Sequence, residues 1–208
     1  MFLPKIYPIT DVRLAKISHA EQVKNLIEGG AEIVQLREKY ASPQEFYESA
    51  KKALEISRPQ NVKIIINDRV DIALILKAHG VHLGQDDLPP EHARKILGEK
   101  AIIGFSTHTL AQAAEAVKFP IDYIAIGPVF ATKTKENPSE IVGIENIKRV
   151  RDAVGNFPLI AIGGITLENF QYVLNAGANS VAIISDLLCD TEKIAERIRI
   201  AIDFCKTS

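Results

Sequence analysis

Eight short apolar runs, rich in isoleucine and valine, recur at regular intervals along the whole chain. This recurrence constrains the fold more than any other feature of the sequence. Most of the runs show no alternation of polar and apolar residues, which is typical of parallel strands buried on both faces. Segments with a helical spacing of apolar residues, such as 144–154, separate them. The runs cover residues 6–9, 33–36, 62–66, 81–83, 101–105, 123–126, 159–162 and 181–184.

The number of strand–helix units predicts the architecture. Eight units in 208 residues average about 26 residues each, which is the short end of the size range of a (β/α)8 barrel. No linker, low-complexity tract or change in composition divides the chain. We therefore expect one α/β domain over residues 1–208, a (β/α)8 TIM barrel. The alternative is a doubly wound sheet, but such a sheet usually has fewer strands and a glycine-rich turn after the first.

Charge and composition narrow the function classes. The 25 basic and 26 acidic side chains leave a formal net charge of -1, with no basic stretch typical of a nucleic-acid-binding surface. No apolar run reaches the roughly 18 residues of a membrane span, and segment 1–10 lacks a signal-peptide pattern. The two cysteines, Cys189 and Cys205, form no CxxC motif. We expect a cytoplasmic protein that handles small molecules. A homodimer is compatible with the sequence, which leaves the oligomeric state open.

Polar residues follow the expected strands, where barrel enzymes place their active sites. After the second strand, Gln35, Arg37 and Lys39 alternate and should face one side. Leu36 and Glu38 should face the other. Arginine can grip an anion through two parallel hydrogen bonds and lysine adds a point charge, so this segment suits an anionic ligand. Ordinary ion pairing with neighbouring acidic residues is the alternative.

Two aspartates, Asp68 and Asp87, follow the third and fourth strands, which should be neighbours. Two carboxylates without clustered cysteine or histidine indicate a hard cation, and Mg²⁺ shared with a substrate phosphate is the natural candidate. The alternative is that Asp68 caps the helix that begins near Val70 and that Asp86 or Asp87 caps the helix after Pro89. His79 and His82 lie in a strand and its preceding turn, and we interpret both as structural.

A second anion site is predicted at the last two strands. Gly163 and Gly164 would let a phosphate approach the backbone, and the start of a following helix would offer unpaired N–H groups. Ser185 follows the eighth strand, and barrels often bind phosphate at this loop pair. A tight turn is the alternative for the glycines.

The longest loop, 128–143, carries polar side chains that can close over phosphates, although a solvated charge run is the alternative. These side chains are Thr132, Lys133, Thr134 and Lys135. The first site combines the cations Arg37, Lys39 and Lys135 with Mg²⁺ and two aspartates, which leaves a net charge of about +3. A diphosphate ester carries a charge of about -3, so the first site suits a diphosphate. The second site suits a monophosphate. We therefore expect two small phosphorylated substrates.

Seven segments add a more specific signal. They are YPITD at 7–11, QLREK at 35–39, NDR at 67–69, GVHLGQDD at 80–87, GFSTHT at 104–109, GPVFATKTK at 127–135 and AIGGI at 161–165. In this order, and over nearly the whole chain, they resemble the thiamine-phosphate synthase family. The resemblance implies a transferase of thiamine biosynthesis with a TIM barrel. It would join 4-amino-2-methyl-5-(diphosphooxymethyl)pyrimidine to a thiazole phosphate, releasing diphosphate and forming thiamine monophosphate.

The resemblance also implies a mechanism and a set of site residues. Diphosphate leaves first, a pyrimidine carbocation forms, and the thiazole nitrogen captures it. The residues implied for the pyrimidine diphosphate are Gln35, Leu36, Arg37, Glu38, Lys39, Asn67, Ser106 and Lys135. Those implied for the thiazole phosphate are Thr132, Lys133, Thr134, Gly164, Ile184 and Ser185. The implied Mg²⁺ ligands are Asp68 and Asp87, and the implied catalytic residues are Arg37, Lys39, Ser106 and Lys135.

Some residues depart from the family pattern, and different functions stay open. Lys133 adds an extra charge to the loop, and segment 140–142 stands where a more polar, glycine-rich stretch is expected. Asp186 is expected close to the second phosphate site. One rival function is a thiazole tautomerase of the same superfamily, with His108 as its acid–base group. A non-catalytic barrel that binds thiamine precursors is a second rival, and an unrelated sugar-phosphate barrel enzyme is a third.

Overall fold

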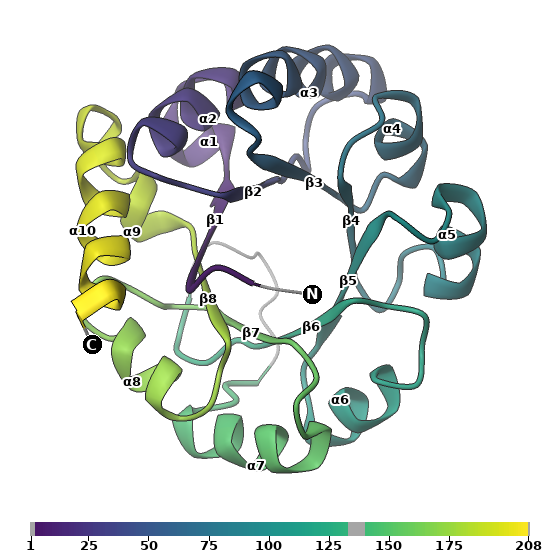
Figure 1. Ribbon diagram of the computed structural model, residues 1–208, viewed down its shortest axis with the longest axis vertical. Coiled ribbons are helices and arrows are strands. Elements are labelled where there is room, and N and C mark those ends of the chain that lie inside the picture. The colour runs from purple at the N-terminus through teal and green to yellow at the C-terminus, as the bar shows by residue number, and fades with distance from the viewer. Residues whose placement is uncertain (1–2, 133–139, 208) are drawn as a thin grey trace.

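A computed structural model describes residues 3–132 and 140–207 of the chain. The described residues contain eight parallel strands that pair in chain order and close into a barrel, with β1 beside β8 (Figure 1). This confirms the (β/α)8 barrel and rules out the doubly wound sheet. The strands are β1 Ile6–Thr10, β2 Ile33–Leu36, β3 Lys63–Asn67, β4 Gly80–Leu83, β5 Ile102–Thr107, β6 Tyr123–Ile126, β7 Leu159–Ile162 and β8 Ser180–Ile183.

Helices surround the barrel (Figure 1). The α-helices are α1 Val12–Ala15, α2 His19–Glu28, α3 Pro43–Ser57, α4 Val70–Ile75, α5 Pro90–Leu97, α6 Leu110–Ala116, α7 Ile144–Val154, α8 Phe170–Asn175, α9 Ser185–Leu188 and α10 Ile194–Thr207. Two 3-10 helices are η1 Arg58–Gln60 and η2 Thr191–Lys193. Ser18 and Ser42 open α2 and α3 with capping boxes. None of the helices in the described residues is long and apolar enough to cross a membrane.

Strand side chains point alternately into the barrel and toward the helices, so the protein has two apolar cores. The larger core lies between the strands and the helices. The inner core consists of Leu3, Tyr7, Ile9, Ile33, Ile65, Tyr123, Ala125, Ile160 and Ala182. Tyr7 and Tyr123 bring hydroxyl groups into this inner core, where the two phenolic oxygens lie 2.8 Å apart.

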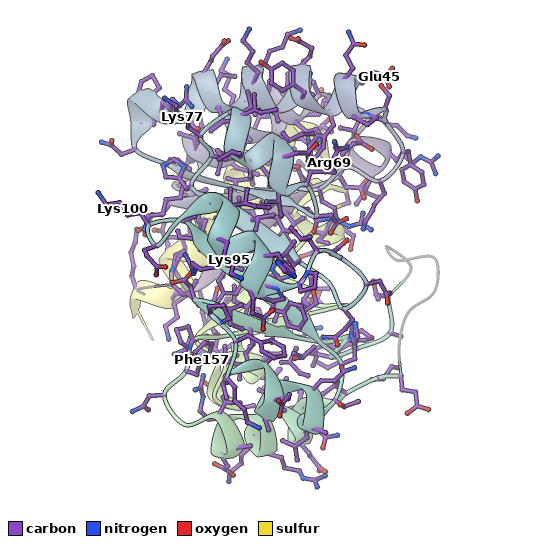
Figure 2. The ribbon with its side chains drawn as sticks, turned by 90° about the vertical axis from the view of Figure 1, so that its right-hand side faces the viewer. Glu45, Arg69, Lys77, Lys95, Lys100 and Phe157 are labelled. Carbon is purple, nitrogen blue, oxygen red and sulfur yellow. The ribbon has the colours of Figure 1, made fainter. Side chains whose placement is uncertain are left out.

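The two ends of the barrel differ in character. Figure 2 shows it from the side: Arg69, which follows β3, lies toward one end, and Lys100, which precedes β5, toward the other. At the end where strands begin, arginines from the helices hold the connecting backbone. Arg151 of α7 donates to the carbonyl oxygens of Gly177 at 2.8 Å and Phe157 at 3.0 Å, just before β8 and β7. Arg94 of α5 donates to the Ala101 carbonyl at 2.6 Å, just before β5.

Candidate active site

A cavity of about 540 Å³ opens at the end of the barrel where the strands finish. Its walls include polar residues from strands on opposite sides of the barrel, among them Lys39 after β2, Ser106 on β5 and Ser185 after β8. The sequence predicted a site at this end, because polar residues follow the strands here and barrel enzymes place their active sites at the C-terminal ends of the strands. A volume of this size is in the usual range for a small-molecule site.

The alternation predicted for residues 35–39 is present. Gln35, Arg37 and Lys39 line the cavity. The Leu36 side chain is fully buried in the outer core. Glu38 turns back onto its own loop, where its carboxylate accepts hydrogen bonds from the backbone N–H groups of the next three residues, at 2.9 to 3.2 Å. Neither Leu36 nor Glu38, which were implied to contact substrate, therefore presents its side chain to the cavity.

Each cation of this segment is paired with an aspartate. Arg37 donates from Nη1 to Asp11 Oδ2 at 3.2 Å, and both side chains are mostly buried. Lys39 forms an ion pair with Asp68 across the mouth of the cavity. The expected alternative of ordinary ion pairing is thus also present. Because both cations still line the cavity, an anionic ligand can contact them there.

The carboxyl groups of Asp68 and Asp87 lie close together. Burial raises the pKa of Asp87, opposed by the hydrogen bond from the Gly84 N–H, and the neighbouring charge of Asp68 raises it further. Neither aspartate caps a helix, since α4 and α5 begin after Arg69 and Pro89 without a side-chain cap. Helix capping therefore does not account for this pair.

This pair fits a hard cation, since two adjacent carboxylates repel each other unless a cation or a proton lies between them. In the described residues no group of three or more His, Cys, Asp or Glu side chains is placed to hold a metal. Further ligands would therefore have to come from substrate oxygens and water, which is the usual arrangement for Mg²⁺ bound with a phosphate.

Asn67 and Ser106 complete the predicted first site. Asn67 ends β3, lines the cavity, and its amide nitrogen is buried without a hydrogen-bond partner. A buried donor of this kind is costly unless a ligand or water accepts from it. Ser106 lies on β5 and also lines the cavity.

His82 is a site residue that the sequence interpretation missed. It lies on β4, lines the cavity, and its Nε2 is 2.8 Å from Ser106 Oγ. Burial lowers the pKa of His82 to about 4, and the charge of Asp87 only partly opposes this. His82 pairs with Asn67 on one side and Gly104 on the other, a strand register that the structure shows and the sequence alone does not. The interpretation of His79 as structural agrees with its position, since its Nδ1 accepts from the Ile64 N–H at 3.0 Å.

The predicted second site lies on the opposite wall of the same cavity, where Thr132, Gly164, Ile184 and Ser185 meet. Gly164 has φ +63°, and a Cβ there would lie 2.5 Å from the Ala131 carbonyl oxygen. Glycine is therefore required at this point. The helix expected directly behind it is absent, which corrects that prediction: α8 begins only at Phe170. In the intervening turn, the N–H groups of Thr166 and Leu167 already donate to Asn169 and Asp186.

Asp186 does not face the second site, contrary to expectation. Its carboxylate accepts from the Leu167 N–H at 2.8 Å and from Arg197 Nη2 at 2.7 Å. Arg197 also donates from Nε to the Asp186 carbonyl. These contacts turn the carboxylate away and neutralise its charge, so it places no repulsive charge in the cavity.

The long loop is fixed at its base. Val142 and Gly143 donate backbone hydrogen bonds to the carbonyls of Pro128 and Val129. Glu140 and Ile141 are exposed and do not line the cavity. Three of the predicted loop residues, Lys133, Thr134 and Lys135, lie outside the described residues.

Known proteins resemble the chain over most of its length. Residues 6–187 match the family described as thiamine monophosphate synthase. A thiamine-phosphate synthase from Koribacter versatilis is 44% identical over 200 residues, covering 93% of each protein. One from Clostridium novyi is 44% identical over 185 residues, covering 88% of this chain and 90% of the relative.

A solved structure gives the same result. The thiamine phosphate pyrophosphorylase from Pyrococcus furiosus superposes with a TM-score of 0.87 at 34% identity, covering 98% of this chain and 96% of that one. These similarities confirm the family that the seven sequence segments resemble and, with it, an enzyme of the transferase class. The chain belongs to the thiamine monophosphate synthase family.

Proposed function

We propose that the protein condenses 4-amino-2-methyl-5-(diphosphooxymethyl)pyrimidine with a thiazole phosphate to give thiamine monophosphate and diphosphate. The observation that carries this proposal is that two differently built groups of residues, each suited to an anion, line one cavity. Arg37 and Lys39 lie with an aspartate pair on one wall, and Gly164 lies with Ser185 on the other. Two phosphorylated substrates would thereby meet with their reacting atoms between the walls.

The first wall would bind the diphosphate that leaves. Arg37 and Lys39 would stabilise the negative charge that develops on the departing oxygens, which is the interaction that accelerates such a step most. Asp68 and Asp87 would hold Mg²⁺, which when bound supplies further charge stabilisation to the diphosphate. Asn67 offers its unpaired amide N–H to the same group.

The remaining walls would guide the second half of the reaction. A pyrimidine carbocation reacts with whatever nucleophile is near, so water must be kept away from it. The inner core closes the floor of the barrel beneath the cavity. Gly164 and Ser185 would hold the thiazole phosphate so that its ring nitrogen reaches the carbocation before water does. The increase in rate would then come from positioning and not from acid–base chemistry.

A direct assay tests this function. The protein is incubated with both precursors and Mg²⁺, and thiamine monophosphate and diphosphate are measured. We expect stoichiometric formation of both, loss of turnover with excess EDTA, and a higher Mg²⁺ requirement in Asp68→Asn and Asp87→Asn. Binding of the precursors without turnover would instead indicate a non-catalytic barrel, and full activity in EDTA would contradict the metal site.

A tautomerase is the second candidate, because His108 also lines the cavity. Its Nδ1 lies 2.7 Å from the Gly127 carbonyl oxygen and must donate to it, which leaves Nε2 of the neutral ring as a proton acceptor. A tautomerase that lost its general base should slow by about 10²–10⁴-fold. For a synthase, we expect His108→Ala to lower condensation only modestly and Ser106→Ala to lower it more.

Assaying both variants for thiazole isomerisation separates the two candidates. A wild-type protein that isomerises the thiazole phosphate, makes no thiamine monophosphate, and loses isomerisation in His108→Ala would contradict the proposed synthase.

A further inference from the structure

A continuous chain of polar side chains crosses the interior of the barrel along the floor of the cavity. The Gln35 amide nitrogen lies 3.4 Å from the Tyr7 hydroxyl, which is 2.8 Å from the Tyr123 hydroxyl. The Tyr123 hydroxyl is 3.0 Å from His82 Nδ1, and His82 Nε2 is 2.8 Å from Ser106 Oγ. Both tyrosines are at most 1% exposed. The surrounding inner core is apolar, so bulk water does not supply alternative partners.

Counting hydrogens fixes the direction of this chain. The Gln35 amide nitrogen can only donate, so the Tyr7 oxygen accepts from it. Among the described residues the Tyr123 hydroxyl is the only acceptor within reach of the Tyr7 hydrogen, which therefore goes to Tyr123. The Tyr123 hydroxyl hydrogen then goes to His82 Nδ1. A neutral histidine has one ring hydrogen, which must therefore sit on Nε2 and point at Ser106. Ser106 Oγ accepts this bond and keeps its own hydrogen for a group in the cavity.

Packing holds the histidine ring in this position. The rings of His82 and Tyr123 stack with centroids 5.5 Å apart and an interplanar angle of 23°. Tyr123 can lie there because β5 has Gly104 opposite it, and a Cβ at that position would meet the tyrosine ring at 2.0 Å. A fixed ring gives the Nε2 hydrogen, and hence the Ser106 hydroxyl, a single direction.

We propose that His82 is a positioning residue that orients the Ser106 hydroxyl as a hydrogen-bond donor to the substrate. The acceptor would be a neutral aromatic ring nitrogen, and this part rests on the proposed function, which places a pyrimidine in the cavity. A serine and a histidine at 2.8 Å also have the geometry of an activated nucleophile, in which histidine takes the serine proton. The chain of donors runs the opposite way, so Ser106 is neither a nucleophile nor a base here.

The first test is the histidine tautomer, which needs no substrate. In ¹⁵N-histidine-labelled protein near neutral pH, we expect His82 to show an unprotonated Nδ1 and a protonated Nε2. The resonances are assigned by their loss in His82→Gln. A proton on Nδ1, or on both nitrogens, would overturn the proposed direction. Because this measurement is independent of turnover, it remains decisive even if the condensation assay fails.

The second test compares two amides at position 82. In His82→Gln, the side-chain nitrogen can take the place of Nε2 and donate to Ser106. In His82→Asn, the amide is too short to reach it. We expect His82→Gln to keep most of kcat, and His82→Asn to lose on the order of 10-fold to 10²-fold in kcat with a smaller change in KM, because the donor is misplaced. Circular dichroism and thermal unfolding check that both variants fold.

A double-mutant cycle separates positioning from a merely structural role. If His82 acts through Ser106, then His82→Asn should cost little further activity in a Ser106→Ala background. Equal losses in both backgrounds, or equal activity of the Gln and Asn variants, would contradict the positioning role. A wild-type protein with no condensation activity would refute the proposed function and the pyrimidine acceptor, while the tautomer would still decide the direction of the chain.

Discussion

At the scale of single residues, orientation decides which members of a motif can act on a ligand. Gln35, Arg37 and Lys39 line the cavity, whereas Glu38 organises the loop that carries Lys39. Burial raises the pKa of Glu38, but hydrogen bonds from Tyr40 and Ala41 outweigh it and hold the pKa below its usual value. The carboxylate therefore stays charged and keeps these N–H groups in place.

The first prediction concerns Arg37. Removing one preorganised donor to developing negative charge typically costs about 10²–10³ in rate, and we expect Arg37→Ala to lose this much in kcat/KM. It would also leave the Asp11 carboxylate without its ion-pair partner. Arg37→Lys should recover only part of the loss, since the planar fork is missing. Steady-state kinetics measure both, and near-wild-type values for Arg37→Ala would reduce the residue to an ion-pair partner of Asp11.

The second prediction concerns the buried His82. Its pKa is about 4 in the folded protein against 6.5 ordinarily, with Asp87 and Lys39 as the nearby charges. The unfolded chain therefore binds a proton on this ring as the pH falls below 6.5, whereas the folded protein does not. The ring's contribution is complete above pH 6.5 and declines by up to about 1.4 kcal/mol per pH unit down to about pH 4.

Denaturant unfolding of wild type and His82→Gln between pH 7 and 4 measures this effect. We expect a steeper loss of unfolding free energy for wild type. Parallel curves for the two proteins would show that burial does not suppress protonation of this ring.

Site residues could be predicted from the sequence where the alternation of side chains along a strand alone decides which of them face the cavity, as for Gln35, Arg37 and Lys39. His82 could not be predicted in this way, because its role depends on a tyrosine from β6 that lies 41 positions away along the chain. Nor could the harmless position of Asp186 be foreseen. Its partner Arg197 belongs to α10, and the sequence of a helix does not show which distant residue one of its arginine side chains will contact.

At the scale of elements, the strands were predictable because a strand buried on both faces must be apolar along its whole length. The weaker prediction was the helix after β7. The segment GGIT does resemble a tight strand-to-helix turn, but Asn169 accepts a hydrogen bond from the Thr166 N–H inside the turn, and the helix begins only at Phe170. A polar side chain that bonds to the backbone of a turn competes locally with helix formation, and sequence alone does not show which prevails.

The third prediction tests how β5 accommodates its neighbour. A Cβ on Gly104 would lie 2.0 to 2.4 Å from ring atoms and the hydroxyl of Tyr123, which must then move within a packed core. We expect Gly104→Ala to lower the unfolding free energy by about 1–3 kcal/mol and to reduce kcat, because the shifted tyrosine no longer holds His82. Chemical denaturation and the condensation assay measure the two effects. Unchanged stability would mean that the barrel can widen at this point.

At the scale of the whole molecule, residues that stabilise the fold lie at one end of the barrel and the cavity lies at the other. Arg94 and Arg151 hold the connections that precede the strands, and the cavity lies where the strands end. A protein divided in this way can lose stability at one end without losing chemistry at the other.

The fourth prediction tests this division. Arg151 donates to Gly177, Phe157 and Asn179, and its removal leaves their oxygens without these bonds. We expect Arg151→Ala to lower the unfolding free energy by about 2–3 kcal/mol while kcat/KM at 25 °C stays within about two-fold, since a residue at this end does not contact the cavity. Arg37→Ala is the matched control, in which the loss of kcat/KM should be large whatever the loss of stability from the unpaired Asp11. A large loss of activity in folded Arg151→Ala would show that the two ends are coupled.

The pair of tyrosines at the floor of the cavity gives the protein an optical property. The chain contains five tyrosines and no tryptophan, so energy transfer to tryptophan does not quench the tyrosine fluorescence. Tyr7 and Tyr123 both line the cavity and are hydrogen-bonded to each other, whereas Tyr47 and Tyr172 lie on outer helices. A heterocycle that stacks or hydrogen-bonds above them should change their fluorescence directly. The native protein thus carries its own reporter of when the cavity fills and empties, with no dye or engineered label.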